Sequence, residues 1–205
     1  MLRYDPQTAL VVVDVQNDFA DPNGSLSVAG GERVVERVND EIAMAVGAGA
    51  TVAFTQDWHP ETTPHFAKDG GIWPVHCVAG SWGAELHPGL RAPDDAPRVR
   101  KGTRGEDGYS GFTMRDPVSG ETSPTALEGL LRDRGIQRLV VTGLATDYCV
   151  KATAIDGVRL GFETAVLVDA IAPVDLEPGD GARALEEMRD AGVLAVADGD
   201  PVSPS

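Results

Sequence analysis

Short, almost uninterrupted apolar runs constrain the fold of this chain more than any other feature of its sequence. Residues 8–15 contain hardly any polar side chain before the aspartate near their end, and residues 138–142 form a similar run. A strand that is apolar on both faces is buried on both faces, which is typical of a parallel sheet covered by helices. Further strands are predicted at residues 50–55, 98–101, 162–168 and 193–196.

Helical patterns lie between these predicted strands. Within residues 32–46, apolar side chains recur at the spacing of an amphipathic helix, and glycines follow them. Other helices are predicted at residues 123–134, where Ser123-Pro124-Thr125 opens the helix, and at residues 147–160 and 178–191. The alternation predicts the α/β class: a doubly wound, mainly parallel six-stranded sheet with helices on both faces.

Polar, glycine-rich segments connect these elements. Loops are predicted at residues 16–31, 57–93 and 102–122. A loop as long as the second one is usually functional when it lies inside a compact domain. Because the chain has 205 residues, we expect one domain over residues 1–205, with a loose C-terminal tail from about residue 198.

Composition argues against several classes of partner. The net charge is −15, which disfavours nucleic acid and anionic membranes as partners. The sequence contains no apolar run long enough to predict a transmembrane helix and no pattern of a signal peptide. Two cysteines, Cys77 and Cys149, do not make a disulfide framework and predict a reduced, cytoplasmic setting. The oligomeric state stays open, a homo-oligomer included.

Polar residues follow four predicted strands at their C-terminal ends. They are Asp14, Asp57 with His59, Lys101, and the turn that ends at Cys149. In an open α/β sheet, ligands bind in the crevice beyond these strand ends. Each residue also has an ordinary interpretation, because an aspartate can cap a turn and a lysine usually lies on a solvated surface. Their coincidence at one edge of the sheet favours a functional site.

Cys149 is the candidate nucleophile of this site. It follows a predicted strand and lies near the start of a predicted helix, where unpaired N–H groups favour negative charge. We therefore expect its thiol to ionise more easily than a free thiol, although a lone cysteine is more often a small buried side chain. Asp14 can accept the thiol proton and return it to a leaving amine, and Lys101 can stabilise the thiolate. The backbone N–H groups of Ala145 and Cys149 can bind a developing oxyanion.

The histidines indicate a second kind of chemistry. His59, His65 and His76 all lie in the predicted loop that begins at Asp57. Asp57 and His59 are two residues apart and point the same way on an extended segment. Aspartate and histidine ligands suit one divalent metal ion such as zinc, iron or manganese. The alternative is that the histidines anchor the loop.

The motifs occur in an order that resembles the nicotinamidase branch of the isochorismatase-like cysteine hydrolases. The similarity covers roughly residues 8–197. It rests on Asp14-Val15-Gln16-Asn17-Asp18-Phe19, Asp57-Trp58-His59-Pro60, Trp73-Pro74-Val75-His76-Cys77, Lys101-Gly102, Tyr109-Ser110-Gly111-Phe112 and Gly143-Leu144-Ala145-Thr146-Asp147-Tyr148-Cys149-Val150. Several motifs in order make the resemblance specific, whereas any one of them alone would be weak.

The resemblance implies an isochorismatase-like hydrolase fold and a nicotinamidase activity, in which nicotinamide is hydrolysed to nicotinate and ammonia through a cysteine thioester. Pyrazinamide is a further substrate that it implies. The implied site residues are a triad of Asp14, Lys101 and Cys149, and metal ligands Asp57, His59 and His76, with His65 as a fourth ligand in some members. A cis peptide before Ala145 and aromatic side chains around the ring, here Phe19 and Trp73 with Tyr109 nearby, are implied as well. Phe19 could equally be an ordinary loop anchor.

Two alternatives remain at this point. A carbamoyl-amide hydrolase of the same fold would keep the triad but would not need the aspartate and histidine loop, and an isochorismatase usually lacks the cysteine. A non-enzymatic metal-binding or ligand-binding domain would have an unreactive Cys149 and a replaceable Lys101. That last alternative does not explain why an aspartate, a lysine and a cysteine follow three different strands.

Overall fold

The structure is a computed structural model of the chain, and it describes residues 4–197. Its centre is a six-stranded sheet in the order β3-β2-β1-β6-β7-β8, in which all neighbouring strands run parallel. The strands are β1 (Thr8–Val13), β2 (Thr51–Asp57), β3 (Arg98–Lys101), β6 (Arg138–Leu144), β7 (Glu163–Ala172) and β8 (Leu194–Val196). The predicted six-stranded parallel sheet is therefore confirmed.

The strand order changes direction beside β1. The chain continues from β1 to β2 and β3 on one side, whereas β6, β7 and β8 lie on the other. Ligands of doubly wound sheets bind at such a switch point, beyond the carboxyl ends of the strands. Val13 and Gly143 are paired there, and a Cβ atom on Gly143 would lie 2.1 Å from the carbonyl oxygen of Val13. Only glycine allows the two strand ends to approach so closely.

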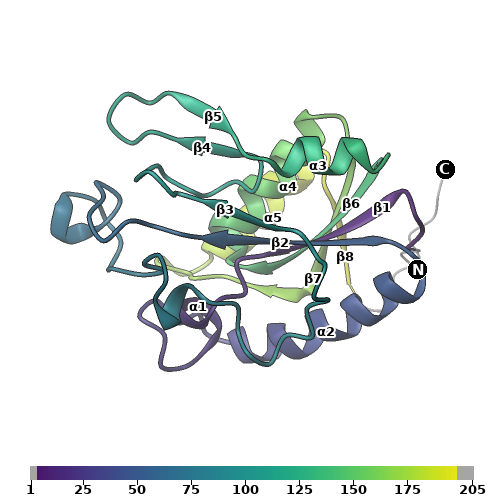
Figure 1. Cartoon of the computed structure of the whole chain (residues 1–205), viewed down its shortest axis with the longest axis horizontal. Coiled ribbons are helices and arrows are strands. Elements are labelled where there is room, and N and C mark those ends of the chain that lie inside the picture. Colours follow the sequence, from purple (N-terminus) through teal and green to yellow (C-terminus); the bar gives the residue numbers. More distant parts are fainter. Residues whose placement is uncertain (1–3, 198–205) are drawn as a thin grey trace.

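Helices cover both faces of the sheet, as predicted (Figure 1). They are α2 (Gly31–Gly47) on one face and α3 (Leu127–Asp133), α4 (Lys151–Arg159) and α5 (Asp180–Asp190) on the other. Leu10 of β1 packs in a buried cluster with Val34 of α2. Its neighbour Val11 lies in a second buried cluster with Ala154 of α4 and Met188 of α5. Successive side chains of β1 thus enter two cores, which explains its unbroken apolar sequence.

One helix start was predicted wrongly. Ser123-Pro124-Thr125 does not open a helix, because β5 (Thr122–Pro124) pairs antiparallel with β4 (Thr113–Arg115) in a separate hairpin. Proline disfavours helical backbone at the residue before it, which keeps Ser123 extended. The helix α3 begins only at Leu127, whose N–H donates to Oγ1 of Thr125 at 3.1 Å.

The long segment between β2 and β3 is irregular, as predicted, and contains only the short 3-10 helices η1 (Ala67–Asp69) and η2 (Trp82–Ala84). The predicted loop at residues 16–31 instead contains a short helix, α1 (Asn17–Ala20). The predicted helix at residues 147–160 begins as a π-helix, Thr146–Val150, before α4 continues it. The predicted loose tail from residue 198 lies outside the described residues.

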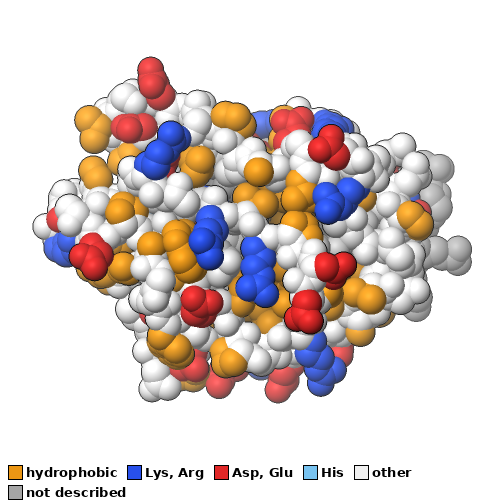
Figure 2. Space-filling model, in the orientation of Figure 1, with side chains coloured by type: hydrophobic (Ala, Val, Ile, Leu, Met, Phe, Trp, Pro, Cys, Tyr) orange, Lys and Arg blue, Asp and Glu red, His pale blue; other side chains and the backbone are white. Residues whose placement is uncertain are grey.

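One face of the molecule carries side chains of both charges (Figure 2). On the face drawn in Figure 2, acidic and basic side chains are interspersed, so the acidic excess of the chain is not gathered into one patch there. Within residues 4–197, no helix combines the length and the apolar character that crossing a bilayer would require. The cytoplasmic location and the absence of nucleic-acid and membrane partners stay predictions.

Candidate active site

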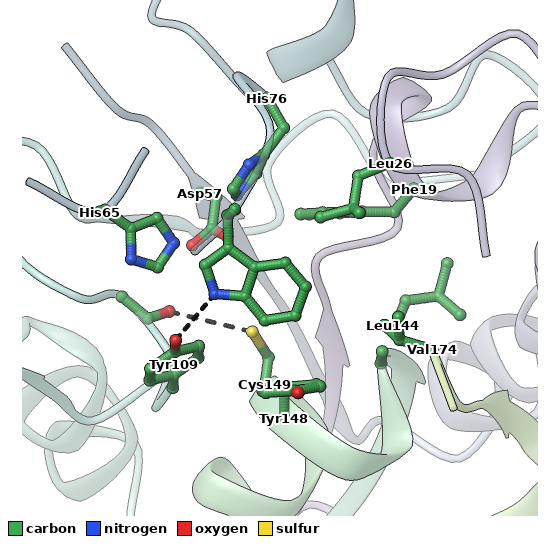
Figure 3. A pocket seen from close by; sticks show the side chains of 13 residues that line it. Phe19, Leu26, Asp57, His65, His76, Tyr109, Leu144, Tyr148, Cys149 and Val174 are labelled. Atoms are coloured by element: carbon green, nitrogen blue, oxygen red, sulfur yellow. Dashed lines mark hydrogen bonds and ion pairs between the residues drawn. The ribbon is translucent and has the colours of Figure 1, made fainter. Parts of the chain in front are cut away.

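A pocket opens beyond the carboxyl ends of the central strands (Figure 3). The empty space within it and at its open mouth amounts to about 400 Å³. Its lining consists of Phe19, Leu26, Asp57, His65, Trp73, His76, Gly108, Tyr109, Leu144, Ala145, Tyr148, Cys149 and Val174. The predicted nucleophile, the predicted aromatic side chains and three of the predicted metal ligands, Asp57, His65 and His76, therefore border the same space, whereas His59 does not line it.

The structure brings Asp14, Lys101 and Cys149 together. Nζ of Lys101 lies 2.7 Å from Oδ2 of Asp14 and 3.6 Å from Sγ of Cys149. The same ammonium group contacts the carbonyl oxygen of Gly108 and Oδ1 of Asp57. Lys101 is fully buried, as alternation along β3 predicts, because exposed and buried residues alternate from Arg98 to Lys101. Its position at the strand end places one buried cation among two carboxylates and a thiol.

Charge and burial together set the protonation of this group. Burial raises the pKa of Asp14 to about 6, against the opposing effect of Lys101. Burial would lower the pKa of Lys101, but Asp14 and Asp57 outweigh it and raise that pKa well above its usual value. The lysine is thus held as an ammonium, whereas Asp14 can both take up and release a proton near neutral pH.

The expectation that the Cys149 thiol ionises easily is wrong for the free protein. Burial raises the pKa of Cys149 well above its ordinary value, and the nearby ammonium of Lys101 opposes this shift without overcoming it. The helix N-terminus was visible in the sequence, but the depth of burial was not. The resting side chain is therefore a thiol with a proton to give away, and acceptor atoms of Asp14, Asp57 and Cys149 lie within 4.8 Å of one another.

The turn after β6 carries both predicted oxyanion-binding residues, Ala145 and Cys149. The peptide between Leu144 and Ala145 is cis, as the family resemblance implied. The turn is fastened by the buried carboxylate of Asp147, which accepts hydrogen bonds from the N–H groups of Val174 and Asp175, both at 2.9 Å. The sequence analysis did not assign a role to Asp147, although a buried acid inside a quoted motif was a usable signal.

The histidine cluster, His59, His65 and His76, forms the second half of the site. One ring nitrogen of each lies within 4.8 Å of those of the other two, and all three residues are buried. Oδ2 of Asp57 lies 3.8 Å from Nε2 of His59 and 3.9 Å from Nε2 of His76. Asp57 thus lies beside two of the three histidines, and the roles of the four residues as metal ligands stay a prediction.

The hydrogen bonds of the ring nitrogens fit a bound cation. Nδ1 of His76 lies 2.7 Å from the carbonyl oxygen of Pro74, and Nδ1 of His65 lies 2.7 Å from Oδ1 of Asp107. Such contacts at Nδ1 leave Nε2 as a metal ligand. Neither ring nitrogen of His59 has a hydrogen-bond partner among the described residues, although the residue is fully buried. A buried imidazole without partners is costly unless something else binds it.

Protonation favours metal binding as well. Burial lowers the pKa of His76 to about 4, which keeps its ring neutral. Burial would raise the pKa of Asp57, but Lys101 and the neighbouring histidines outweigh it and lower that pKa well below its usual range. Neutral imidazoles and an ionised carboxylate are the forms that bind metal ions.

Aromatic side chains form the wall of the pocket. Nε1 of Trp73 donates a hydrogen bond to the hydroxyl oxygen of Tyr109 at 2.9 Å, and Phe19 lies 5.5 Å from the ring of His76 (Figure 3). The sequence analysis missed Tyr148, whose ring packs edge-on against Trp73 at 4.8 Å. Leu26, Leu144 and Val174 were missed as lining residues too, because apolar residues in loops and strand ends carry no distinctive pattern.

Comparison with known proteins agrees with this geometry. The isochorismatase domain family matches residues 8–198. The nicotinamidase of Escherichia coli is 38% identical, with 91% of this chain and 93% of that protein covered. The pyrazinamidase of Pyrococcus horikoshii, solved in complex with zinc, is 40% identical with a TM-score of 0.83, covering 94% of this chain and 99% of that one. PnC1 from L. infantum, solved in complex with nicotinate, is 36% identical with a TM-score of 0.85, covering 96% of each chain.

Proposed function

This chain belongs to the isochorismatase domain family, and from that premise we propose that it is a nicotinamidase, an amidohydrolase that converts nicotinamide to nicotinate and ammonia. The observation that carries the proposal is that one aromatic-lined pocket is bordered both by the Cys149 thiol and by His65 and His76 of the histidine cluster. The first supplies a nucleophile for a carboxamide, and the second supplies a place where a ring nitrogen can be held. Nicotinamide has both groups on one small planar ring.

The acylation half of the reaction begins at Cys149. Its sulfur attacks the carboxamide carbon while the thiol proton passes to the carboxylate of Asp14. The negative charge on the carboxamide oxygen is bound by the N–H groups of Ala145 and Cys149. When the C–N bond breaks, Asp14 returns the proton to the departing nitrogen, and ammonia leaves. A thioester between Cys149 and the nicotinoyl group remains.

Hydrolysis of the thioester reverses these roles. Asp14 accepts a proton from water, and the resulting hydroxide attacks the thioester carbonyl. The C–S bond breaks, Asp14 gives its proton to the sulfur, and nicotinic acid leaves and loses its proton to solvent as nicotinate. Because burial raises the pKa of Asp14 to about 6, this carboxyl group is suited to exchange protons in both directions. Lys101 remains an ammonium throughout and stabilises the charge that develops on Asp14 and Cys149.

The proposed metal ligands are Asp57, His59, His65 and His76. These residues would hold a divalent ion, which would supply a Lewis-acidic position for the pyridine nitrogen. We propose zinc because the similar pyrazinamidase was solved with zinc and because the ligands include three imidazoles, while iron and manganese suit the same ligand types. Phe19, Trp73 and Tyr109 then enclose the ring, and pyrazinamide fits the proposal as a second substrate.

A carbamoyl-amide hydrolase of the same fold is less well supported. Such an enzyme would use the triad but would leave the three buried histidines and the partnerless ring of His59 without a purpose. In the proposal a single domain carries both the triad and the histidine cluster. The cytoplasmic setting remains a prediction of the sequence, and the oligomeric state stays open.

The test is ammonia release from nicotinamide by the purified protein, with nicotinate identified by chromatography. We expect turnover that is lost after prolonged treatment with a chelator and restored by added zinc. A carbamoyl amide offered in parallel should be a poor substrate. Hydrolysis of the carbamoyl amide in preference to nicotinamide, unaffected by chelation, would replace this proposal by its rival.

A further inference from the structure

Asp107 touches the histidine cluster without belonging to it. Its Oδ1 lies 2.7 Å from Nδ1 of His65, and the side chain of the aspartate is only 15% exposed. His65 stacks on His59 with ring centroids 4.7 Å apart. The carboxylate thus approaches the cluster from the side opposite to the ring nitrogen that is left for a ligand.

The hairpin of β4 and β5 holds Asp107 in place. The backbone N–H of Asp107 donates to the carbonyl oxygen of Arg115 at 2.7 Å, and the N–H of Arg115 donates back at 3.1 Å. Because Arg115 also pairs with Thr122 of β5, this two-way pairing attaches Asp107 to the other edge of β4. Backbone pairing of this kind restricts movement of the Cα atom of Asp107, so its carboxylate is held in a fixed position.

A second contact fastens the segment that carries His65. Oγ1 of Thr63 donates to the carbonyl oxygen of Gly105 at 2.9 Å and accepts from the N–H of His65 at 3.2 Å. The loop after β2 and the loop before β4 are therefore joined at two neighbouring points, Thr63 with Gly105 and His65 with Asp107. These contacts bring together segments about 42 residues apart in sequence.

We propose that Asp107 is a positioning residue for His65, which accepts a hydrogen bond from Nδ1–H and thereby directs Nε2 into the metal site as a fourth protein ligand. The inference rests on the metal centre of the proposed function. A carboxylate behind a metal-binding histidine fixes its tautomer and ring orientation and raises its basicity.

The other two histidines of the cluster make this role specific to His65. His76 is oriented by the carbonyl oxygen of Pro74, two residues away in its own loop, and His59 has no hydrogen-bond partner among the described residues. Only the orientation of His65 is set by a side chain from a distant segment. The ordinary explanation, an ion pair of Asp107 with Arg115, is weak, because the two groups are 3.9 Å apart and the arginine side chain is 61% exposed.

The experiment measures zinc affinity of the metal-free protein by competition with a coloured chelator, so that no substrate is needed. We expect Asp107→Ala to weaken zinc binding about 10- to 100-fold, the range found when such partners of metal-binding histidines are removed. The matched control is Asp116→Ala, which removes the same charge from the same hairpin, where Asp116 accepts hydrogen bonds from the N–H groups of Val118 and Ser119. The control should bind zinc like the unmodified protein.

The decisive comparison is made in a His65→Ala background. If Asp107 acts through His65, Asp107→Ala should cause no further loss of zinc affinity once His65 is gone. Asp107→Asn keeps an oxygen acceptor and should lose less zinc affinity than Asp107→Ala. If the alanine variant does not fold, the asparagine variant is compared in both backgrounds instead. Equal losses of zinc affinity in the two backgrounds, or an unchanged zinc affinity in Asp107→Ala, would overturn the role of Asp107 but leave the metal centre standing. Absence of zinc binding by the unmodified protein would overturn the metal centre itself.

Discussion

The two halves of the site are built in different ways. The thiol cluster, Asp14, Lys101 and Cys149, lies at the carboxyl ends of β1, β3 and β6, and its charged groups are in contact with one another. The histidine cluster lies in the irregular segment between β2 and β3, and the buried ring of His59 has no hydrogen-bond partner among the described residues. The first cluster is electrostatically complete within the protein, whereas the second needs a ligand.

This difference indicates a division of labour. A sheet end is rigid and can hold a proton donor and acceptor at fixed distances, which is what bond breaking requires. A loop that closes around a metal ion can set the position and orientation of a ring. Lys101 joins the halves, because its ammonium group contacts both Asp14 and Asp57. We therefore expect changes in the thiol cluster to affect turnover alone, and changes in the histidine cluster to affect metal content first.

The largest effect should follow Cys149→Ala. Removing the nucleophile should lower kcat on nicotinamide on the order of 10⁴-fold or more, because the other members of the triad cannot act without it. Metal content, measured by elemental analysis, should stay at the level of the unmodified protein. Cys77→Ala is the matched control, since this second cysteine is buried against the carbonyl oxygen of Gly83 and should leave turnover largely unchanged. Turnover by Cys149→Ala would remove the distinction between the two halves.

The next effect should follow His59→Ala. Losing this ligand should reduce bound zinc and lower kcat/KM on the order of 10²-fold, by removing the position at which the ring nitrogen binds. The thiol cluster should survive, so the rate of Cys149 alkylation at a given pH should match that of the unmodified protein. His87→Ala serves as the control, because His87 lies outside the cluster, where its Nδ1 accepts a hydrogen bond from Gly89. Full zinc content with low activity would instead assign His59 to the chemistry.

The sheet and the positions of the thiol cluster were predictable from sequence for one physical reason. Strands buried on both faces must be apolar almost throughout, so a polar residue at their end is conspicuous. Exposed and buried residues alternate along the four-residue strand β3, so that Lys101 points inward with Val99, and both are buried. The roles of these residues as a catalytic triad stay a prediction.

The remaining features depend on contacts that local patterns do not encode. The raised pKa of Cys149 results mainly from burial, which outweighs the helix end that the sequence displayed. Asp107 carried no signal, because its proposed role depends on a hydrogen bond to His65, 42 residues away. The helix predicted from Ser123 failed because hairpin pairing with β4 outweighed a local start pattern. Each of these features is determined by contacts with residues distant in sequence, and the local sequence pattern does not reveal those contacts.

The smallest effect should come from the aromatic wall, and it tests whether the histidine half governs binding. Tyr109→Phe removes the hydroxyl that accepts a hydrogen bond from Nε1 of Trp73. A net loss of about 0.5–1.5 kcal/mol should raise KM for nicotinamide about 2- to 10-fold and leave kcat nearly unchanged, because the wall positions the ring without touching the sulfur. Tyr4→Phe makes the same chemical change at the hydroxyl that donates to Glu41, and it should lower stability without altering KM. A fall in kcat at constant KM in Tyr109→Phe would mean that the aromatic wall also acts on the thiol cluster. The route would be Gly108, the neighbour of Tyr109, because its carbonyl oxygen contacts Lys101.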